Sequence, residues 1–391
     1  MDLWPVHLKP KKDELLSSWL VRLAIAHGLK LHTFCSVTWP GKSIWNLDID
    51  KSADADILYK LSDRTGTKAE DVRATTLAAY EGILYEKHNR FGPIAWIMPV
   101  GVFHRRRRKF GLQYCSFCLA EDNEPFYRRR WRLAFIVICE RHHCILQDRC
   151  PNCQEPVNFH RNELGDPKKI VATSLTLCYS CGYDLRQAIT NKQSVNPIRD
   201  CEVQFTLELL KVMDDGFMQI SDATFIHSHL YFTVLRQLMK IGAREGKNLD
   251  NLRQDLRSTY GIDIYLPLGI RPQPDVQEQN IQVRRQLLQF AHCLLLDWPD
   301  RFITLARKHK LWSSLWLRNL DGSAWDRSRT APFWYWSVIH DHLYRAPYHP
   351  SNQEIQSAIR YLAKDRGVIN KSVLARLLGI AVVRRRELLE K

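Results

Sequence analysis

Four pairs of cysteine or histidine residues, each with two residues between its members, lie within residues 115–181 of the chain. A two-residue gap lets the backbone turn so that both side chains point at one ion. Two such pairs complete the tetrahedral shell that structural Zn²⁺ prefers. Taken in order, the pairs predict two structural zinc ions. The first has the ligands Cys115, Cys118, Cys139 and His142, and the second has Cys150, Cys153, Cys178 and Cys181.

Disulfides and a catalytic zinc are the alternatives to structural zinc. The stretch Met1–Pro5 has no basic segment followed by an apolar run, so we expect no signal peptide, and reduced thiols favour metal binding. A catalytic zinc keeps an open position, whereas the protein can fill both shells here. His143 stays an alternative to His142 if the local turn differs, and Cys144 is a further neighbour. The cysteines outside the pattern are expected to be buried small hydrophobes, namely Cys35, Cys201 and Cys293.

Composition indicates a globular protein of two or three domains. The chain has 391 residues and a hydrophobic fraction of 45%. No segment reaches the roughly 18 uninterrupted apolar residues of a membrane span, so we expect a soluble, cytoplasmic protein. The excess of 57 Lys and Arg over 42 Asp and Glu gives a net charge of +15, which is typical of proteins that bind nucleic acid.

Much of the positive charge lies beside the first cysteine pair, with aromatic residues between the basic ones. Arginine neutralises phosphate and flat rings stack on bases, so this pattern favours a nucleic-acid contact. The alternative is a solvated charge run, or arginines that pair with acids over the zinc region. The predicted contacts are Arg105, Arg106, Arg107, Arg108 and Lys109, together with Arg128, Arg129 and Arg130, for which both interpretations stay open.

Residues 1–92 are expected to form a helical module. Asp13 is a candidate cap for a helix that ends at Gly28 and has the apolar stripe Leu16, Trp19, Leu20 and Leu23. A second helix is predicted over 53–64, and Gly66 turns the chain. Thr67–Glu70 has the form of a capping box that opens a helix over 68–80. This helix-turn-helix pattern serves DNA recognition as well as ordinary packing.

The predicted fold class is mainly α. Residues 93–190 are expected to form the zinc-binding region, which includes a strand over 170–176, and residues 191–391 a helical C-terminal domain. The prolines Pro93 and Pro99 separate the first module from the basic run. Helices of the C-terminal domain are predicted over 201–214, 221–241, 249–259, 280–296 and 300–308.

A second helix-turn-helix candidate ends the chain. An amphipathic helix is predicted over 352–363, Asn370 caps a helix over 371–378, Gly379 supplies the turn and a last helix begins near Ala381. In this motif the second helix enters the major groove. Base edges or phosphates would then meet Arg384, Arg385 and Arg386. An ordinary helix pair with a basic exposed face is the alternative.

Three stretches in the first half of the chain combine specific residues with specific spacing. They are Asp13–Ala24, with the sequence DELLSSWLVRLA, Tyr114–Asp122 followed by Trp131–Ala134, and Cys139–Cys153. In these stretches the chain resembles the TniQ/TnsD family of transposition target-selection proteins. The resemblance supports Cys139 and His142 as partners of Cys115 and Cys118. Ser116 departs from the family, which has proline there more often.

The resemblance implies a protein that marks the insertion site of a Tn7-like or CRISPR-associated transposon and recruits an AAA+ ATPase regulator and the transposase. Some members read double-stranded DNA directly, and others dock on a CRISPR effector complex with its guide RNA. Both routes, and a homodimer, stay open, and no membrane partner is expected. The alternative function is a zinc-containing helix-turn-helix transcription regulator. The sequence has no His-Glu-x-x-His motif, no dense carboxylate cluster and no phosphate-binding loop, so we expect no enzymatic activity.

Overall fold

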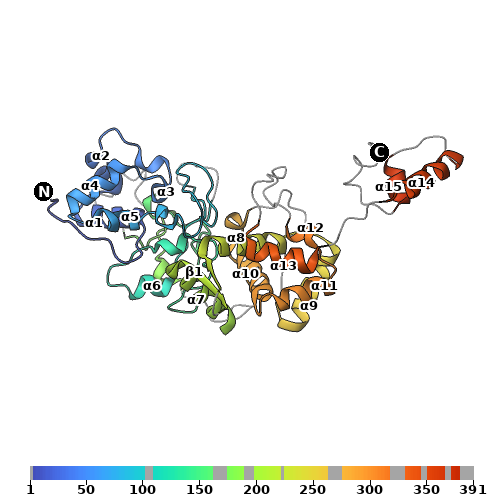
Figure 1. Cartoon of the computed structure of the whole chain (residues 1–391). Helices are drawn as coiled ribbons and strands as arrows, with labels where there is room; N and C mark the ends of the chain where they lie inside the picture. Colours follow the sequence, from blue (N-terminus) through green and yellow to red (C-terminus); the bar gives the residue numbers. More distant parts are fainter. Residues whose placement is uncertain are drawn as a thin grey trace. The chain divides into compact units, whose positions relative to one another are not determined.

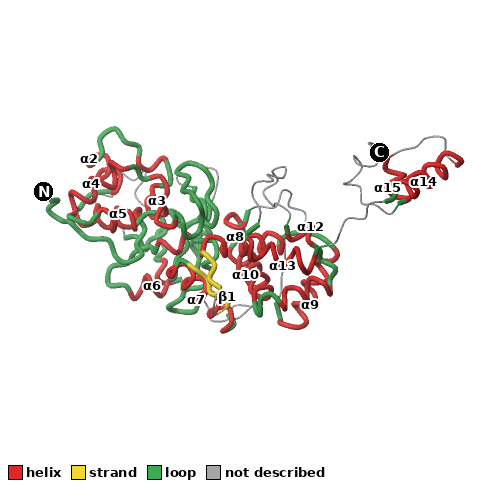
Figure 2. Tube along the Cα trace, viewed as in Figure 1, coloured by secondary structure: helices red, strands yellow, loops and turns green. Residues whose placement is uncertain are grey.

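Helices form most of the secondary structure of this chain, as the sequence predicts (Figure 1, Figure 2). The computed structural model describes residues 3–101, 109–161, 174–188, 198–221, 224–262, 275–317, 331–344, 350–365 and 371–378. The chain has two compact units, Met1–Leu343 and Tyr344–Lys391. The domain boundaries predicted near residues 92 and 190 stay predictions. Within the described ranges, no helix has the length and apolar character needed to cross a membrane.

The N-terminal part of the first unit packs five short helices around the apolar stripe of the first one. The helices are α1 (Leu16–Ala26), α2 (Leu31–Thr38), α3 (Ile49–Ser52), α4 (Ala55–Thr65) and α5 (Ala69–Ala74). Trp19, Leu20 and Leu23 of α1 are fully buried, as the predicted stripe requires. At the end of α4, Gly66 has a φ of 61° and makes the predicted turn toward α5.

The predicted cap of α1 by Asp13 is wrong. Asp13 has a φ of 62°, and its carboxylate lies 3.0 Å from Nε of Arg130. The free N–H of Ser17, in the first turn of α1, donates instead to Oδ1 of Asp50 at 2.7 Å. The carboxylate that serves this helix start therefore comes from α3, more than 30 residues further along the chain.

The predicted capping box at Thr67 is also wrong, and α5 is shorter than expected. The hydroxyl of Thr67 bonds that of Thr65 at 2.7 Å, and α5 begins without a side-chain cap. It ends at Ala74, where the hydroxyls of Thr75 and Thr76 donate to the carbonyls of Val72 and Arg73. A further turn of α5 would need these carbonyls as acceptors for backbone N–H groups, so the hydroxyl bonds favour the end of the helix here.

The region between α5 and α7 (Asp200–Asp215) is held mostly by turns and isolated backbone bridges. It contains α6 (Ser116–Glu121), and bridges join Tyr114 to Gln147 and Ile97 to Leu133. The strand predicted over 170–176 lies partly outside the described residues. Its described part, residues 174–176, is a loop and a turn. Leu175 is buried in the core, so the apolar pattern reflects packing rather than a strand.

The second half of the first unit is a set of packed helices. They are α7, α8 (Ser228–Gly242), α9 (Lys247–Tyr260), α10 (Ile281–Leu295), α11 (Asp300–Lys308), α12 (Ser313–Trp316) and α13 (Phe333–Leu343). Four of the predicted helices, over 201–214, 249–259, 280–296 and 300–308, are confirmed to within two residues at each end. Asn280 caps α10, because its side chain accepts a hydrogen bond from the N–H of Val283 at 2.9 Å.

The helix predicted from residue 221 begins later than expected, because a hairpin precedes it. Strands β1 (Phe217–Ser221) and β2 (Thr224–His227) pair antiparallel, with Met218 opposite Ile226. The short run of threonine, phenylalanine and isoleucine in β2 favours an extended conformation. The helical periodicity therefore applies only from Ser228 onward.

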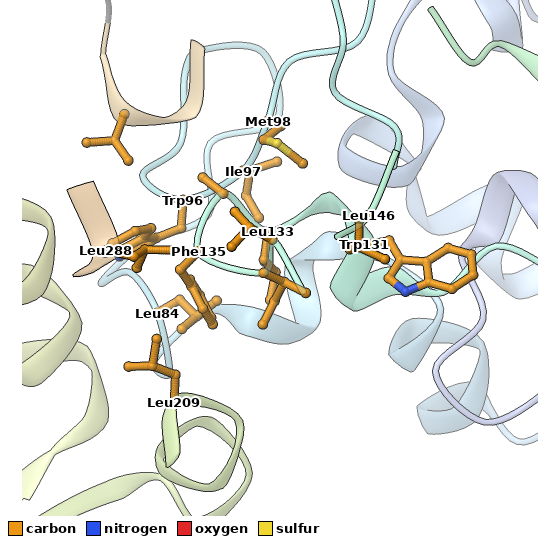
Figure 3. Packing of buried hydrophobic residues seen from close by; sticks show 14 of the residues in the cluster. Leu84, Trp96, Ile97, Met98, Trp131, Leu133, Phe135, Leu146, Leu209 and Leu288 are labelled. Atoms are coloured by element: carbon orange, nitrogen blue, oxygen red, sulfur yellow. The ribbon is translucent and has the colours of Figure 1, made fainter. Parts of the chain in front are cut away.

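One hydrophobic core joins the N-terminal part of the first unit to the helices of its second half. Figure 3 shows Trp96 and Phe135 beside Leu288 of α10, with Leu209 of α7 nearby. The ring of Phe232 in α8 lies 4.8 Å from that of Phe135 and 6.0 Å from that of Trp96, measured between centroids. Aromatic pairs at such distances stabilise a core beyond their buried area.

The second unit contains α14 (Asn352–Asp365) and α15 (Lys371–Leu377), which confirms both predicted helices within the described residues. Ser351 and Glu354 form a reciprocal cap: the Glu354 carboxylate accepts from the Ser351 N–H at 2.7 Å, and the Ser351 hydroxyl accepts from the Glu354 N–H at 3.2 Å. The predicted cap at Asn370, the turn at Gly379 and the last helix from Ala381 lie outside the described residues.

Candidate metal centres

Three of the four cysteine or histidine pairs adopt the same tight turn, which we call the knuckle. The knuckles are Cys139–Cys144, Cys150–Glu155 and Cys178–Tyr183. In each, the N–H of the fifth residue donates to the carbonyl of the first at 2.9 Å, and the N–H of the first donates to the carbonyl of the sixth. The fifth residues have φ values of 49°, 60° and 71° and are His143, Gln154 and Gly182. This left-handed residue closes the turn behind the pair of ligands.

The fourth pair lies at the start of α6 and meets the first knuckle, which gives the first cluster: Cys115, Cys118, Cys139 and His142. Sγ of Cys118 lies 3.6 Å from Sγ of Cys139 and 3.3 Å from Nδ1 of His142. All four ligand atoms lie within 4.8 Å of one another. Zinc bonds of about 2.3 Å to sulfur and about 2.0 Å to nitrogen place tetrahedral ligands roughly 3.5–3.8 Å apart, so the cluster has the size of a zinc shell.

The position of His142, and not that of His143, is inside this cluster. His143 is the left-handed residue of the knuckle, equivalent to Gly182 in another knuckle, and it is exposed. Its role in the turn therefore directs the neighbouring side chain of His142 toward the thiols. The backbone conformation thus separates the two histidines that the sequence left open.

The outer contacts of the first cluster orient His142. Its Nε2 lies 2.9 Å from the carboxylate of Glu121, and its ring stacks on Phe117 with centroids 5.5 Å apart. A carboxylate on the far nitrogen fixes the ring and the tautomer that presents Nδ1 to a metal. Arg141 lies 3.2 Å from the same carboxylate of Glu121. Hydrogen bonds from the thiols of Cys115 and Cys118 lower the pKa of Cys139.

The second and third knuckles face each other and form the second cluster: Cys150, Cys153, Cys178 and Cys181. Sγ of Cys150 lies 3.7 Å from that of Cys181, and Sγ of Cys153 lies 3.6 Å from that of Cys178. A hydrogen bond from the side-chain amide of Asn152 lowers the pKa of the exposed Cys181 to about 6, whereas burial raises the pKa of Cys178 to about 12. Four thiols at tetrahedral spacing are a donor set that suits zinc.

The cysteines outside the two clusters differ in their surroundings. Cys35 and Cys293 are buried, which confirms the prediction for both. Cys201 is exposed, so that prediction is wrong. Cys201 lies in the first turn of α7, and the residues that α7 buries nearby are Glu202 and Val203. The apolar residues near Cys201 in the sequence thus lie on the buried face of α7, whereas Cys201 lies on its exposed face.

The side chains of Arg128, Arg129 and Arg130 are turned toward acids of the protein. Arg128 lies 3.0 Å from Asp122 and its guanidinium covers the rings of Phe126 and Trp131 at 4.5 and 4.7 Å. Arg129 and Arg130 both pair with Asp13, and Arg130 also lies 3.4 Å from Glu140. These ion pairs tie the start of α1 to the segment before the first knuckle. The predicted contact of this group with nucleic acid stays a prediction.

The remaining predicted nucleic-acid contacts are mostly beyond what the structure describes. Arg105, Arg106, Arg107 and Arg108 lie outside the described residues, and so do Arg384, Arg385 and Arg386. Lys109 is described: its ammonium lies 3.0 Å from the carboxylate of Glu278, and both side chains are exposed. An exposed pair of this kind is weak, so Lys109 stays available to another anion.

The sequence reasoning missed a buried ionic centre around Arg132. Arg132 is fully buried, lies 2.6 Å from Asp48 and 3.1 Å from Asp50, and donates to the carbonyl of Met98. Asp50 in turn accepts the Ser17 N–H of α1. The motif residues around Ser17 and Arg132 therefore meet at one centre. The sequence did contain a signal of this centre: Arg132 belongs to the stretch Trp131–Ala134, which is one of the stretches that resemble the family.

A basic hollow of about 590 Å³ lies beside the Gly66 turn. Its basic lining residues are Lys9, Lys11, Lys12, Lys68 and Arg129, and its acidic ones are Asp13, Glu14 and Asp71. Asp13 is paired with Arg129 and Arg130, and Glu14 lies 2.7 Å from Arg22. The hollow therefore exposes more positive than negative charge, although Lys11 also pairs with Glu124.

The fold and the site define a mainly helical protein with two cysteine-rich clusters that could bind metal ions. Residues 5–146 match the TniQ family, so the chain carries a TniQ family domain, and the predicted resemblance is confirmed. This domain contains the whole first cluster, whereas the second cluster follows it. A search of curated proteins finds no match. TniQ family proteins are non-catalytic transposition factors, and the family implies a role in target selection for Tn7-like transposition.

Proposed function

We propose that this protein selects the insertion site of a Tn7-like transposon by binding target DNA, an RNA-guided CRISPR effector, or both, and by recruiting an AAA+ ATPase regulator that brings the transposase. The observation that carries the proposal is the TniQ domain over residues 5–146 with its cluster of four metal-ligand side chains. A domain whose core includes Arg132 and the first cluster is a rigid platform for partners rather than a catalytic centre.

The proposal includes one structural zinc ion in each cluster. Both donor sets have four protein ligands, and the separations of 3.3–3.7 Å between ligand atoms support a closed tetrahedral shell. Zinc at these positions would tie α6 to the first knuckle and the second knuckle to the third. Its part is then to hold the chain in place, since the protein leaves no coordination position open for a substrate.

The nucleic-acid contacts are proposed at Arg105, Arg106, Arg107, Arg108 and Lys109, which shortly precede Cys115 in the sequence. Support comes from the density of basic side chains in the sequence and from the exposed pair of Lys109. Replacing the four arginines with glutamine should weaken binding to all sequences alike and flatten the dependence of log K on log salt by roughly one unit per lost contact. Unchanged affinity and salt dependence would assign this run to a solvated surface.

For direct readout of duplex DNA we propose the segment from Ala381, which the sequence predicts to be a helix, with Arg384, Arg385 and Arg386. Support comes from α14 and α15 as a helix pair that precedes it. Arginine bonds O6 and N7 of guanine in a bidentate way, which is worth about 1–3 kcal/mol of discrimination. Arg384→Ala or Arg385→Ala should then relax the preference at one or two base pairs and leave the metal content unchanged.

The experiment that tests the function is purification of the tagged full-length protein from cells that carry the neighbouring genes, followed by identification of bound proteins and sequencing of bound nucleic acid. Enrichment of one duplex site with an ATPase regulator supports direct target selection. A guide RNA with its effector supports docking. An operator without any transposition protein would overturn the proposal in favour of a zinc-containing transcription regulator.

A further inference from the structure

A fifth thiol lies against the first cluster. Sγ of Cys144 is 3.5 Å from Sγ of Cys115, a separation equal to those between ligand atoms within the cluster. Five metal-binding side chains therefore converge where a tetrahedral ion uses four.

The backbone holds Cys144 in this position. Cys144 is the sixth residue of the first knuckle, and its carbonyl accepts the N–H of Cys139 at 2.8 Å. The sixth residues of the other knuckles are Glu155 and Tyr183, which carry no sulfur. The carboxylate of Glu155 accepts the hydroxyl proton of Tyr179 at 2.9 Å. Closing a knuckle thus needs no thiol at this place, and the sulfur of Cys144 requires a different explanation.

His142 is the least enclosed ligand of the first cluster. Cys115, Cys118 and Cys139 are buried, whereas His142 is half-buried. The partner that holds its ring is Glu121, whose side chain is 52% exposed. Competition with water weakens a hydrogen bond to such a carboxylate. Of the four ligands, His142 can therefore leave the cluster with the least disturbance of the core.

We propose that Cys144 is a reserve ligand, so that the first cluster holds its metal ion with three thiolates and His142 or, when His142 is displaced, with four thiolates. The inference rests on the proposed metal at this cluster. In the exchange the bond from the ion to Nδ1 of His142 breaks and a bond to Sγ of Cys144 forms. The thiol proton passes to solvent, and the released imidazole stays beside Glu121. Both ligand sets are ordinary zinc shells, so the coordination number is unchanged.

The charge around the cluster suits the second ligand set. Exchange of an imidazole for a thiolate makes the site more negative by one charge. Arg141 belongs to the first knuckle and lies 3.2 Å from Glu121 and 3.5 Å from Asp122. A nearby arginine stabilises an added negative charge.

The test uses the full-length protein with Co²⁺ in place of zinc, because the absorption of thiolate-bound Co²⁺ distinguishes three sulfur ligands from four. Wild type should bind two ions per chain. His142→Ala should still bind two, with the spectrum of the first site changed to that of four thiolates. His142→Ala with Cys144→Ser should lose one ion, or bind it about 100-fold more weakly in competition with a chelator, a larger loss than most outer-shell changes cause.

Matched controls separate this exchange from loss of folding. His143→Ala removes the neighbouring histidine, which is outside the cluster, and Cys201→Ser removes an exposed thiol; both should keep two ions and the wild-type spectrum. His142→Cys with Cys144→Ser rebuilds four thiols at the original spacing and supplies the reference spectrum. Its retention of two ions would show that serine at position 144 does not itself prevent folding.

Several outcomes would overturn the inference. One is loss of the first ion from His142→Ala alone. Another is equal binding by His142→Ala with and without the change at Cys144, since water would then fill the vacant position. In both cases a wild type that binds two ions leaves the proposed structural metal intact. A wild type that binds one ion or none would overturn that proposal as well.

Discussion

The guanidinium of Arg284 donates a hydrogen bond of 2.9 Å to the side-chain oxygen of Gln113, so a residue of α10 completes a contact inside the TniQ domain. Arg284 is buried and also donates to the carbonyl of Ala134 at 2.7 Å. It forms no ion pair within the described residues, and burial lowers its pKa to about 10. Gln113 in turn donates to the carbonyls of Trp131 and Ile136. The second half of the first unit is thus hydrogen-bonded to the domain as well as packed on it.

Removal of this link should destabilise the first unit. We expect Arg284→Met to lower the free energy of unfolding by about 1–3 kcal/mol, because it leaves the oxygens of Gln113 and Ala134 without a donor. In a double-mutant cycle measured by urea unfolding, Arg284→Met and Gln113→Met should couple by about 0.5–3 kcal/mol. Arg284→Met with the distant Lys42→Met should instead be additive. Additivity of the first pair would contradict the link.

Arg132 should be the most sensitive ionic residue of the domain. Arg132→Met leaves Asp48 and Asp50 without their cation in the interior, and such a loss costs about 3–5 kcal/mol. Lys42→Met, which breaks exposed pairs with Asp54 and Asp56, should change the free energy of unfolding by at most about 1 kcal/mol. Denaturant unfolding of both variants measures the difference. Similar effects of the two changes would show that the Arg132 centre adds no stability.

The metal content should follow the clusters one by one. Purified protein should contain two zinc ions by elemental analysis. Cys118→Ser, combined with Cys144→Ser so that the fifth thiol cannot replace the lost ligand, should lose the ion of the first cluster, and Cys178→Ser should lose that of the second. A chelator should lower the thermal midpoint of wild type, since structural zinc contributes folding free energy. One zinc ion or none in wild type, or two in either variant, would contradict the assignment.

Acid should destabilise the protein through His292. Burial lowers the pKa of His292 to about 4, with Arg199 and Arg301 adding to the effect, and its ring stacks on Phe205. The unfolded chain binds a proton near pH 6.5 and the folded one only near pH 4, so stability falls as the pH decreases through this window. Between pH 7 and pH 5 wild type should lose about 1–2 kcal/mol more than His292→Phe. Urea unfolding at both pH values measures this difference. If wild type and His292→Phe lose the same stability, His292 does not cause the acid sensitivity.

Gly242 should tolerate no side chain. A Cβ on this residue of α8 would lie 2.7 Å from a ring carbon of the buried Phe290 in α10. Gly242→Ala should therefore destabilise the helix pair by about 1–3 kcal/mol through overpacking. Thr233→Ala on the exposed side of α8 is the control and should stay within about 0.5 kcal/mol. Thermal unfolding of the two variants measures the difference. If Gly242→Ala is as stable as wild type, the ring of Phe290 moves to make room for the methyl group.

What the sequence predicted well depends on local chemistry. The two-residue spacing predicted the ligand pairs that bring Cys115, Cys118, Cys139 and His142 to one place, and the periodicity predicted the helix over 280–296. The two ligands of each pair lie within one turn of backbone, so the geometry of a pair is largely independent of the rest of the fold. The meeting of two pairs, such as Cys118 with Cys139, depends on the fold.

The features that the sequence did not predict depend on contacts between residues far apart in the chain. Asp13 stands where a helix cap would, but Arg129 and Arg130 draw its carboxylate away. The acidic partners of those arginines, among them Glu140, are scattered in the sequence, so the sequence did not predict these particular ion pairs. The two-residue spacing favoured His142 over His143, and the positive φ of His143 supplies the physical reason.

The two clusters follow each other along the chain without interleaving, since residue 142 completes the first and residue 150 begins the second. During synthesis on a ribosome, the first set of ligands is therefore complete before any ligand of the second has been made. If the first cluster holds the proposed metal ion, the TniQ domain has all four ligands at that stage, while Arg284 is still to be translated. The order of the ligands thus allows the first cluster to form early in synthesis. The helical second half of the first unit can then pack onto a domain that is already folded.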